Sequence, residues 1–204
     1  MKTKTLISTM MGCLAALCLT SCLSDNDDIK DTSASLTLAD IALCFQAVEG
    51  HYTGDLIHSD ITSDPTSYAS DTIVGTWYIP TDSTLIITNF PSRLLAENIS
   101  NPDLKEALAA EPDQTINCKI GFVTKDPIQF LVNPAVLTYN LHYGSSDHKV
   151  QVAFLANSGY SFGNYDALKN ELSMQIVEGG LYIDGLQSTY LTTAPFQFVS
   201  KKKE

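Results

Sequence analysis

From Gly50 onward, short runs of Tyr, Thr, Ile, Val and Phe are separated by turn residues, and this pattern constrains the fold more than any other feature. β-Branched and aromatic residues suit a pleated sheet, whereas Gly, Pro, Asn and Asp favour turns. We expect about ten strands from these runs. The runs are GHYTGDLIH, DTIVGTWYI, STLIITN, TINCKIGFV, DPIQFLV, PAVLTYNLHY, KVQVAFLA, ELSMQIVE, LYIDGLQ and PFQFVS. Because helices do not alternate with these strands, the pattern predicts an antiparallel β-barrel or sandwich.

Two turn-rich segments are predicted to be hairpin loops. SSDHK comes after Tyr143 and Gly144, and EGG, which begins at Glu178, directly precedes Leu181. Both segments combine Gly, Ser or Asp between apolar runs, as hairpin loops do.

Two regions are predicted to be helical. Residues 35–50 contain Thr37 and Asp40 at the spacing of a capping box, with Gly50 as a stop signal. The apolar stripe expected to dock on the core consists of Leu38, Ile41, Leu43, Phe45 and Val48. SRLLAENI and PDLKEALAAE form a second helical region, an insertion between two strands, with Pro102 in a first turn. The expected fold is a single, mainly all-β domain over residues 36–204.

The N-terminus has the organisation of an export signal. Lys2 and Lys4 precede a charge-free stretch from Thr5 to Thr20, which is too short to span a membrane comfortably. The stretch ends in Leu19-Thr20-Ser21-Cys22, which resembles the bacterial lipobox. That resemblance implies a signal peptide over residues 1–21, cleavage before Cys22 and lipid on its thiol and amine. The alternative is a cysteine that happens to lie in a signal peptide or an N-terminal core helix.

Residues 22–35 are polar and acidic and are expected to form a flexible tether. The chain has a net charge of −11, and loss of Lys2 and Lys4 with the leader would make it −13. Such a chain repels nucleic acid, so a nucleic-acid partner is not expected. The predicted membrane partner is bacterial outer-membrane lipid, through the N-terminal acyl anchor.

Cys44 and Cys118 are the cysteines left after Cys22. An exported protein permits a disulfide between them, but both lie in apolar contexts that also suit separate buried thiols. Spacing alone leaves both possibilities open.

The histidines offer little metal-binding chemistry. His51 and His58 are an odd number of residues apart on a predicted strand, so they should face opposite sides of the sheet. His142 and His148, with Asp147, come closest to a metal constellation; the alternative is a solvated hairpin tip. We predict no metal and no cofactor.

No catalytic motif stands out. Gly159-Tyr160-Ser161-Phe162-Gly163 has the letters of a Gly-x-Ser-x-Gly motif but lacks the strand-to-helix setting of a nucleophile elbow, and carboxylate pairs for glycoside hydrolysis cannot be recognised from sequence. The segment NSGYSFGNYD carries Tyr160, Phe162 and Tyr165 and is expected to be a loop. Its aromatic side chains suit ligand contact, such as stacking on a sugar, or they cover the end of the core.

Gly75-Thr76-Trp77-Tyr78 resembles the Gly-x-Trp motif of calycin-type barrels of the lipocalin sort, one strand late. In that family a short helix leads into the first strand, where this chain has Gly50-His51-Tyr52. The resemblance implies a barrel and adds Trp77 and Tyr78 as candidate ligand contacts. The alternative is a Trp that anchors a β core beside a strand glycine.

The leader, the acidic tether and the entry VEGHYTG resemble small surface lipoproteins of Bacteroidetes, and within them an uncharacterised domain-of-unknown-function family. That family implies no known activity. Aspartates just after Cys22 resemble an export signal to the outer face of the outer membrane. Bacteroidetes attach O-glycans at Asp-Ser/Thr-apolar triplets, which Asp71-Thr72-Ile73 resembles; in Asp82-Ser83-Thr84 a Thr takes the last place.

The leading functional hypothesis is a non-enzymatic binding module, lipid-anchored at the cell surface, for a small apolar ligand, a glycan or an envelope protein. An apolar pocket would favour it. A hydrolase with acids from separate loops is the second hypothesis, favoured by facing carboxylates with one raised pKa. A structural surface subunit is the third, favoured by an open strand edge or a large exposed apolar patch.

Overall fold

The first and last strands pair with each other, and this pairing closes the sheet into a barrel. In the computed structural model, which describes residues 35–60, 69–157 and 159–203, eight antiparallel strands form the ring. In order around it they are β11 (Ala194–Lys203), β1 (Gly50–Asp60), β2 (Ala69–Thr81), β3 (Thr84–Phe90), β4 (Gln114–Lys125), β5 (Ile128–Pro134), β8 (Phe162–Asp166) and β9 (Glu171–Ile183). β9 then pairs with β11. The predicted antiparallel β class is confirmed, and the fold is a barrel.

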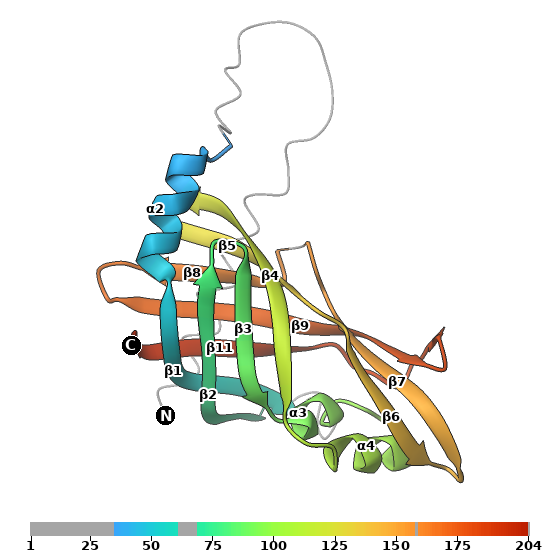
Figure 1. Cartoon of the computed structure of the whole chain (residues 1–204). Coiled ribbons are helices and arrows are strands. Elements are labelled where there is room, and N and C mark those ends of the chain that lie inside the picture. Colours follow the sequence, from blue (N-terminus) through green and yellow to red (C-terminus); the bar gives the residue numbers. More distant parts are fainter. Residues whose placement is uncertain (1–34, 61–68, 158, 204) are drawn as a thin grey trace, which may run out of the picture. The chain divides into compact units, whose positions relative to one another are not determined.

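A two-stranded extension continues the barrel wall beyond one end. β6 (Leu137–Tyr143) follows β5 after a short kink, and β7 (Ser146–Phe154) leads back toward β8. β9 is long enough to pair with β8 along its first half and with β7 along its second half. Figure 1 shows β6 and β7 reaching away from the barrel, past α3 and α4. A short β10 (Leu186–Gln187) pairs with the end of β9.

Helix α2 (Leu38–Val48) leads directly into β1, and its predicted capping box is confirmed. The Asp40 amide donates to Thr37 Oγ1 over 3.1 Å, and the Thr37 amide donates to Asp40 Oδ2 over 3.1 Å. The predicted apolar stripe is wrong in part, because Leu38 and Leu43 are 86% and 64% exposed. The buried side chains are Cys44 and Val48, four residues apart, so the docked face is rotated from the expected one.

The helical insertion is confirmed as α3 (Ser92–Ala96) and α4 (Pro102–Ala109). Asn101 caps α4 by accepting the Leu104 amide at 3.0 Å, and Pro102 stands in the first turn, where its missing N–H costs nothing. Leu104 and Leu108 are buried where α4 packs against β6. Within the described ranges, no helix is long and apolar enough to cross a membrane.

Large side chains fill the barrel interior. Those with less than 2% exposure include Tyr52, Trp77, Phe90, Phe130, Phe196 and Phe198. Trp77 meets the edge of Phe198 with ring centroids 5.5 Å apart, and Phe90 meets Phe196 at 5.1 Å. Edge-to-face contacts of this kind add to the free energy gained by burial.

The hairpin predicted at EGG is wrong. Residues Glu171–Ile183 form one continuous strand, with a bulge at Glu178 and Gly179 where pairing passes Phe154 on β7. A Cβ on Gly179 would collide with the Leu155 side chain, so this glycine gives room for packing and makes no turn. The chain reverses instead at Asp184 and Gly185, whose φ angles of 52° and 84° suit a two-residue hairpin turn.

NSGYSFGNYD was expected to be a loop, but its second half forms β8 between β5 and β9. Gly163 allows this, because a Cβ at that position would collide with the ring of Phe130 on the neighbouring strand. The hairpin after Tyr143 is confirmed, with a shorter turn than expected: Gly144 and Ser145 alone connect β6 to β7.

Candidate functional site

The bulge in β9 points a carboxyl group into the junction between barrel and extension. Glu178 lies opposite Ala194 of β11 on one side and Phe154 of β7 on the other. Its side chain follows Leu172, Met174 and Ile176 on the inward face and has no solvent exposure. Bulges re-aim side chains, and this one places an acid where the strand pattern would otherwise continue with apolar groups.

Neither carboxyl oxygen of Glu178 has a hydrogen-bond partner in the described part of the chain. Burial, and secondarily the negative charge of Glu97, raise the pKa of Glu178 well above its ordinary value. Burial without a hydrogen-bond partner therefore favours the protonated, neutral form of Glu178, since an isolated buried carboxylate is strongly disfavoured.

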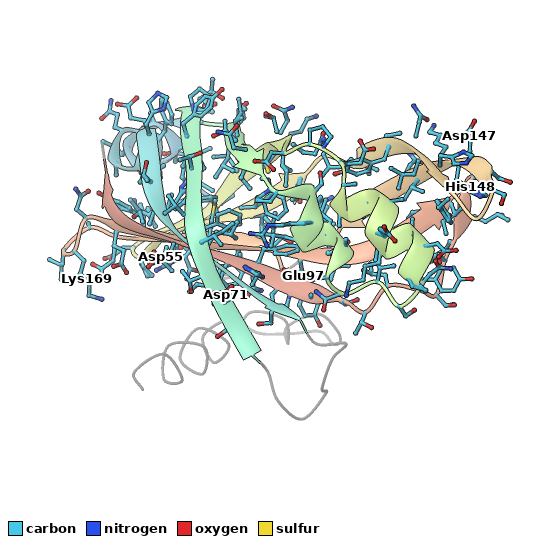
Figure 2. The ribbon with its side chains drawn as sticks, turned by 90° about the horizontal axis from the view of Figure 1, so that it is seen from below. Asp55, Asp71, Glu97, Asp147, His148 and Lys169 are labelled. Carbon is cyan, nitrogen blue, oxygen red and sulfur yellow. The ribbon has the colours of Figure 1, made fainter. Side chains whose placement is uncertain are left out.

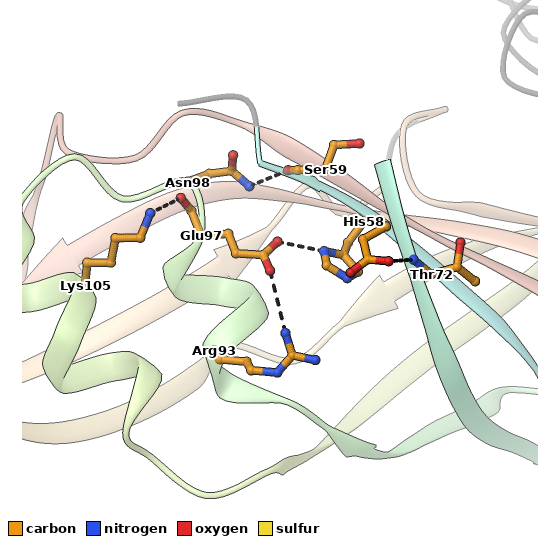
Figure 3. A network of polar contacts seen from close by, with 8 residues as sticks. His58, Ser59, Thr72, Arg93, Glu97, Asn98 and Lys105 are labelled. Carbon is orange, nitrogen blue, oxygen red and sulfur yellow. Dashed lines mark hydrogen bonds and ion pairs between the residues drawn. The ribbon is translucent and has the colours of Figure 1, made fainter. Parts of the chain in front are cut away.

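Glu97, at the C-terminal end of α3, is the charged partner in this pair of acids. Its Oε2 atom lies 2.7 Å from Nδ1 of His58, and its Oε1 atom lies 3.8 Å from the Arg93 guanidinium. Figure 3 shows Glu97 reaching between His58 and Arg93. His58 is 4% exposed, and its Nε2 atom has no partner among the described residues. We call His58, Arg93, Glu97 and Glu178 the junction cluster.

Further hydrogen bonds attach the end of α3 to its surroundings. The Asn98 amide donates to the main-chain oxygen of Ser59 at 3.1 Å, and Lys105 Nζ donates to the main-chain oxygen of Glu97 at 2.7 Å (Figure 3). The Thr192 amide donates to the oxygen of Asn98 at 3.0 Å. The helical insertion is thus joined to β1 and to the chain before β11 at the same place as the junction cluster.

A buried acid with a raised pKa near a second acid resembles an acid–base pair of an enzyme. Here the neutral member has no solvent exposure, so in this conformation it cannot touch a substrate. Among the residues that the structure describes, no group of three or more His, Cys, Asp or Glu could hold a metal ion. In this conformation, the chemistry open to the junction cluster is to hold a proton on the buried carboxyl group of Glu178.

The candidate aromatic ligand contacts do not form one site. Trp77 is 1% exposed and stacks on Tyr52, and Tyr165 is 8% exposed within the core. Tyr78 is half-buried on the outer wall, with its ring 5.0 Å from that of His51. Phe162 and Tyr160 lie close in sequence at the start of β8, with 9% and 63% exposure. Their role as ligand contacts stays a prediction, and Tyr160 is the most accessible of the five.

An amide pair lies beside Tyr160 on the barrel wall. Gln175 of β9 donates from Nε2 to the main-chain oxygen of Tyr160 at 2.8 Å. Gln197 of β11 donates to Oε1 of Gln175 at 3.3 Å. The two glutamines fix the main chain that carries the exposed tyrosine, and we call these three residues the tyrosine face.

The histidines at the hairpin tip bind different aspartates. Nδ1 of His142 lies 2.7 Å from Asp147 and Nδ1 of His148 lies 2.8 Å from Asp184. The His142, Asp147 and His148 trio therefore does not converge on one point. Figure 2 shows His148 and Asp147 at the end of the domain opposite Lys169. His51 and His58 face opposite sides of the sheet, since His51 is exposed and His58 is buried.

Both candidate O-glycosylation positions are exposed. Thr72 lies on β2, where Asp71 accepts a hydrogen bond from the Thr72 amide at 2.7 Å, and Ser83 lies in the turn before β3.

Cys22, the signal peptide over residues 1–21 and most of the tether lie outside the described residues. Cys44 and Cys118 are both free and buried, so the structure has the separate thiols and no disulfide.

Sequence reasoning missed the junction cluster. One signal was available: Glu178 is the only charged residue in the run Leu172–Ile183, and it follows an apolar strand pattern at a position where a strand would point inward. From the sequence, His58 is expected only to face the side of the sheet opposite His51, and Glu97 lies in the predicted helical insertion. His58 and Glu97 come together because α3 folds back against β1, and the spacing of residues in the sequence does not reveal this contact.

Neither the curated proteins nor the solved structures contain a match to this chain. A family model described as a domain of unknown function, DUF4840, matches residues 47–183. The match runs from the end of α2 through β9 and includes every residue of the junction cluster. The chain belongs to the DUF4840 family.

Proposed function

We propose that this protein is a non-enzymatic binding module, held at the outer face of a bacterial outer membrane by lipid on Cys22, and that the tyrosine face binds a glycan. The exposure of Tyr160 carries this proposal. A tyrosine offers a flat apolar surface and a hydroxyl at low entropic cost, and side-chain amides match sugar hydroxyls as donors and acceptors.

The geometry of the tyrosine face supports binding to a preformed surface. Gln175 and Gln197 connect β9, β11 and the main chain of Tyr160, so the ring is presented from a fixed point of the barrel wall. A preorganised aromatic group loses less conformational entropy on binding than a mobile one. A small apolar ligand or an envelope protein remains an alternative occupant of this face.

The second candidate is an envelope hydrolase, and one observation favours it. Glu97 and Glu178 come from separate elements, and one of them has a raised pKa. An enzyme using this pair would have to expose Glu178 during turnover. Burial of Glu178 in the closed barrel supports the binding role over the catalytic one.

A glycan array probed with purified residues 23–204 tests the proposal. We expect selective binding that Tyr160→Ala reduces at least tenfold, with an unchanged melting temperature. Leu168→Ala is the matched control, because Leu168 is 99% exposed on a different turn, and it should bind as the wild type. Array silence, or binding that Tyr160→Ala leaves intact, would remove the tyrosine face as a glycan site. Hydrolysis of an arrayed glycan that Glu178→Gln abolishes would establish the enzyme instead.

The anchor is tested separately. Metabolic labelling with a clickable palmitate analogue should mark the wild type in a Bacteroidetes host, and Cys22→Ser should lose the label and leave the membrane fraction. Deleting Asp25–Asp28 should keep the label but protect the protein from external protease.

The barrel and the helix that enters it at Gly50 also support kinship with calycin-type barrels. Glycans at Thr72 and Ser83 would appear as mass increments that Thr72→Ala and Ser83→Ala remove.

A further inference from the structure

We propose that the junction cluster is a proton-operated latch: a proton on Glu178 keeps the α3–α4 insertion closed against the barrel, and loss of that proton releases it.

The latch joins three separate parts of the fold. His58 comes from β1, Glu97 from the end of α3, and Glu178 from the bulge of β9. The contact between His58 Nδ1 and Glu97 Oε2 and the bond from Asn98 to Ser59 connect α3 to β1. Glu178 is fully buried near this connection and has no hydrogen-bond partner among the described residues, so we expect its ionisation to oppose the closed arrangement.

The groups around Glu178 offer it no counter-ion. Arg93 and His58 are already engaged with Glu97, and Lys105 donates to the main-chain oxygen of Glu97. β11 and β7 present uncharged Ala194 and Phe154 directly opposite.

The other titratable groups near the cluster are acids and a tyrosine. Asp71 stands opposite His58 on β2, and Tyr139 of β6 hydrogen-bonds Ser92. Burial raises the pKa of Tyr139 to about 12, and its hydrogen bond with Ser92 opposes this. An ionised Glu178 would therefore feel the negative charge of Glu97 without a cation of its own, and reaching water would require the insertion to move.

The direction of the pH dependence follows from linkage. The pKa of Glu178 is higher in the folded protein than in the unfolded chain. The stabilisation is therefore complete below the unfolded pKa of about 4.3 and is lost as pH rises through the folded pKa. Between that unfolded pKa and the folded pKa, opening should become about tenfold more frequent per pH unit, because the closed form still holds a proton that the open form has lost; above the folded pKa this dependence ends.

Trypsin offers a direct readout, since Arg93 and Lys105 lie in the insertion itself. We expect cleavage at these sites in residues 23–204 to accelerate between pH 7 and pH 10 relative to Glu178→Gln at the same pH. This ratio cancels the pH profile of trypsin. Glu106→Gln, an exposed change on α4, is the matched control and should follow the wild type. Equal pH dependence in the wild type and Glu178→Gln would overturn the latch.

Two further measurements do not depend on the folding of Glu178→Gln. Glu97→Gln removes a negative charge that helps to raise the pKa of Glu178, so the pH-dependent rise in cleavage should level off at a lower pH. Infrared spectra of the wild type at pH 7 should contain the carbonyl band of a protonated, non-hydrogen-bonded carboxyl that disappears as cleavage begins. Absence of that band at pH 7 would contradict the proposal.

Discussion

The ring of Tyr52 lies over the ring of Trp77, with centroids 5.9 Å apart and planes 4° from parallel. The Tyr52 hydroxyl donates to the main-chain oxygen of Val48 at 2.5 Å. Val48 is the last residue of α2, so one side chain connects the helix end to the centre of the barrel. This arrangement explains why Trp77 is buried: it is the platform on which the first strand and its helix are fixed.

Replacing Trp77 by Ala should therefore cost about 3–5 kcal/mol in the free energy of unfolding, as expected for loss of a fully buried aromatic side chain. Tyr52→Phe keeps the stacking and loses one hydrogen bond, so it should cost about 1 kcal/mol. Urea unfolding of residues 23–204 measures both. Val74→Ala, at a position 69% exposed, is the control and should change stability by less than about 0.5 kcal/mol. Equal losses for Tyr52→Phe and Trp77→Ala would mean that the hydroxyl bond, and not the ring, holds α2.

Two glycines on neighbouring parts of the barrel give a matched pair of substitutions. A Cβ on Gly163 would overlap the ring of Phe130, whereas a Cβ on Gly121 would meet nothing within 4 Å. We expect Gly163→Ala to destabilise the protein by about 1–3 kcal/mol and Gly121→Ala to be close to neutral. Thermal unfolding of both variants measures the difference. The double variant Gly163→Ala/Phe130→Leu should lose less stability than the sum of the two single losses. If it loses the full sum, overlap with the Phe130 ring is not the cause.

The antiparallel β class was predictable because most strands can be recognised from the pattern of their own residues. The alternation in β1 and β4 sets one apolar face against one polar face, and Asn101-Pro102 begins α4 through local chemistry alone. The capping box of α2 is equally local. These elements follow from interactions between residues a few positions apart.

The wrong predictions concern segments whose structure depends on contacts with residues distant in the sequence. Gly179 looks like a turn residue in sequence, but the space that it leaves is used by Leu155. β8 carries Gly, Asn and Asp and has little strand propensity, and it forms because β5 and β9 provide partners on both sides. Leu38 and Leu43 belong to an apolar helix whose docked face is chosen by the barrel. The junction cluster is of the same kind, since His58, Glu97 and Glu178 meet only after the barrel has closed.

The two remaining thiols should react slowly in the folded protein. Burial raises the pKa of Cys118 to about 12, and burial together with the charge of Asp40 raises the pKa of Cys44. Because the thiolate is the reactive form, a thiol reagent at pH 8 should label neither cysteine quickly. After unfolding without reductant, residues 23–204 should release two equivalents of thiol. Zero equivalents would identify a disulfide between Cys44 and Cys118, which the structure does not have.

The end of α2 nearest the chain's N-terminus should be sensitive to acid through Asp40. Its hydrogen bonds with Lys125 and then Thr37 lower the pKa of this carboxyl to about 2. A pKa lower in the folded state gives a stabilisation that is present above the unfolded pKa of about 3.9 and is lost as pH falls through about 2. Asp40→Asn should thus unfold at lower urea concentration than the wild type at pH 7, and the two should converge near pH 2. Lys125→Met separates the two contributions, because it removes the ion pair and leaves the capping box. A wild-type advantage over Asp40→Asn that persists below pH 2 would show that the carboxylate charge is not what fastens the helix.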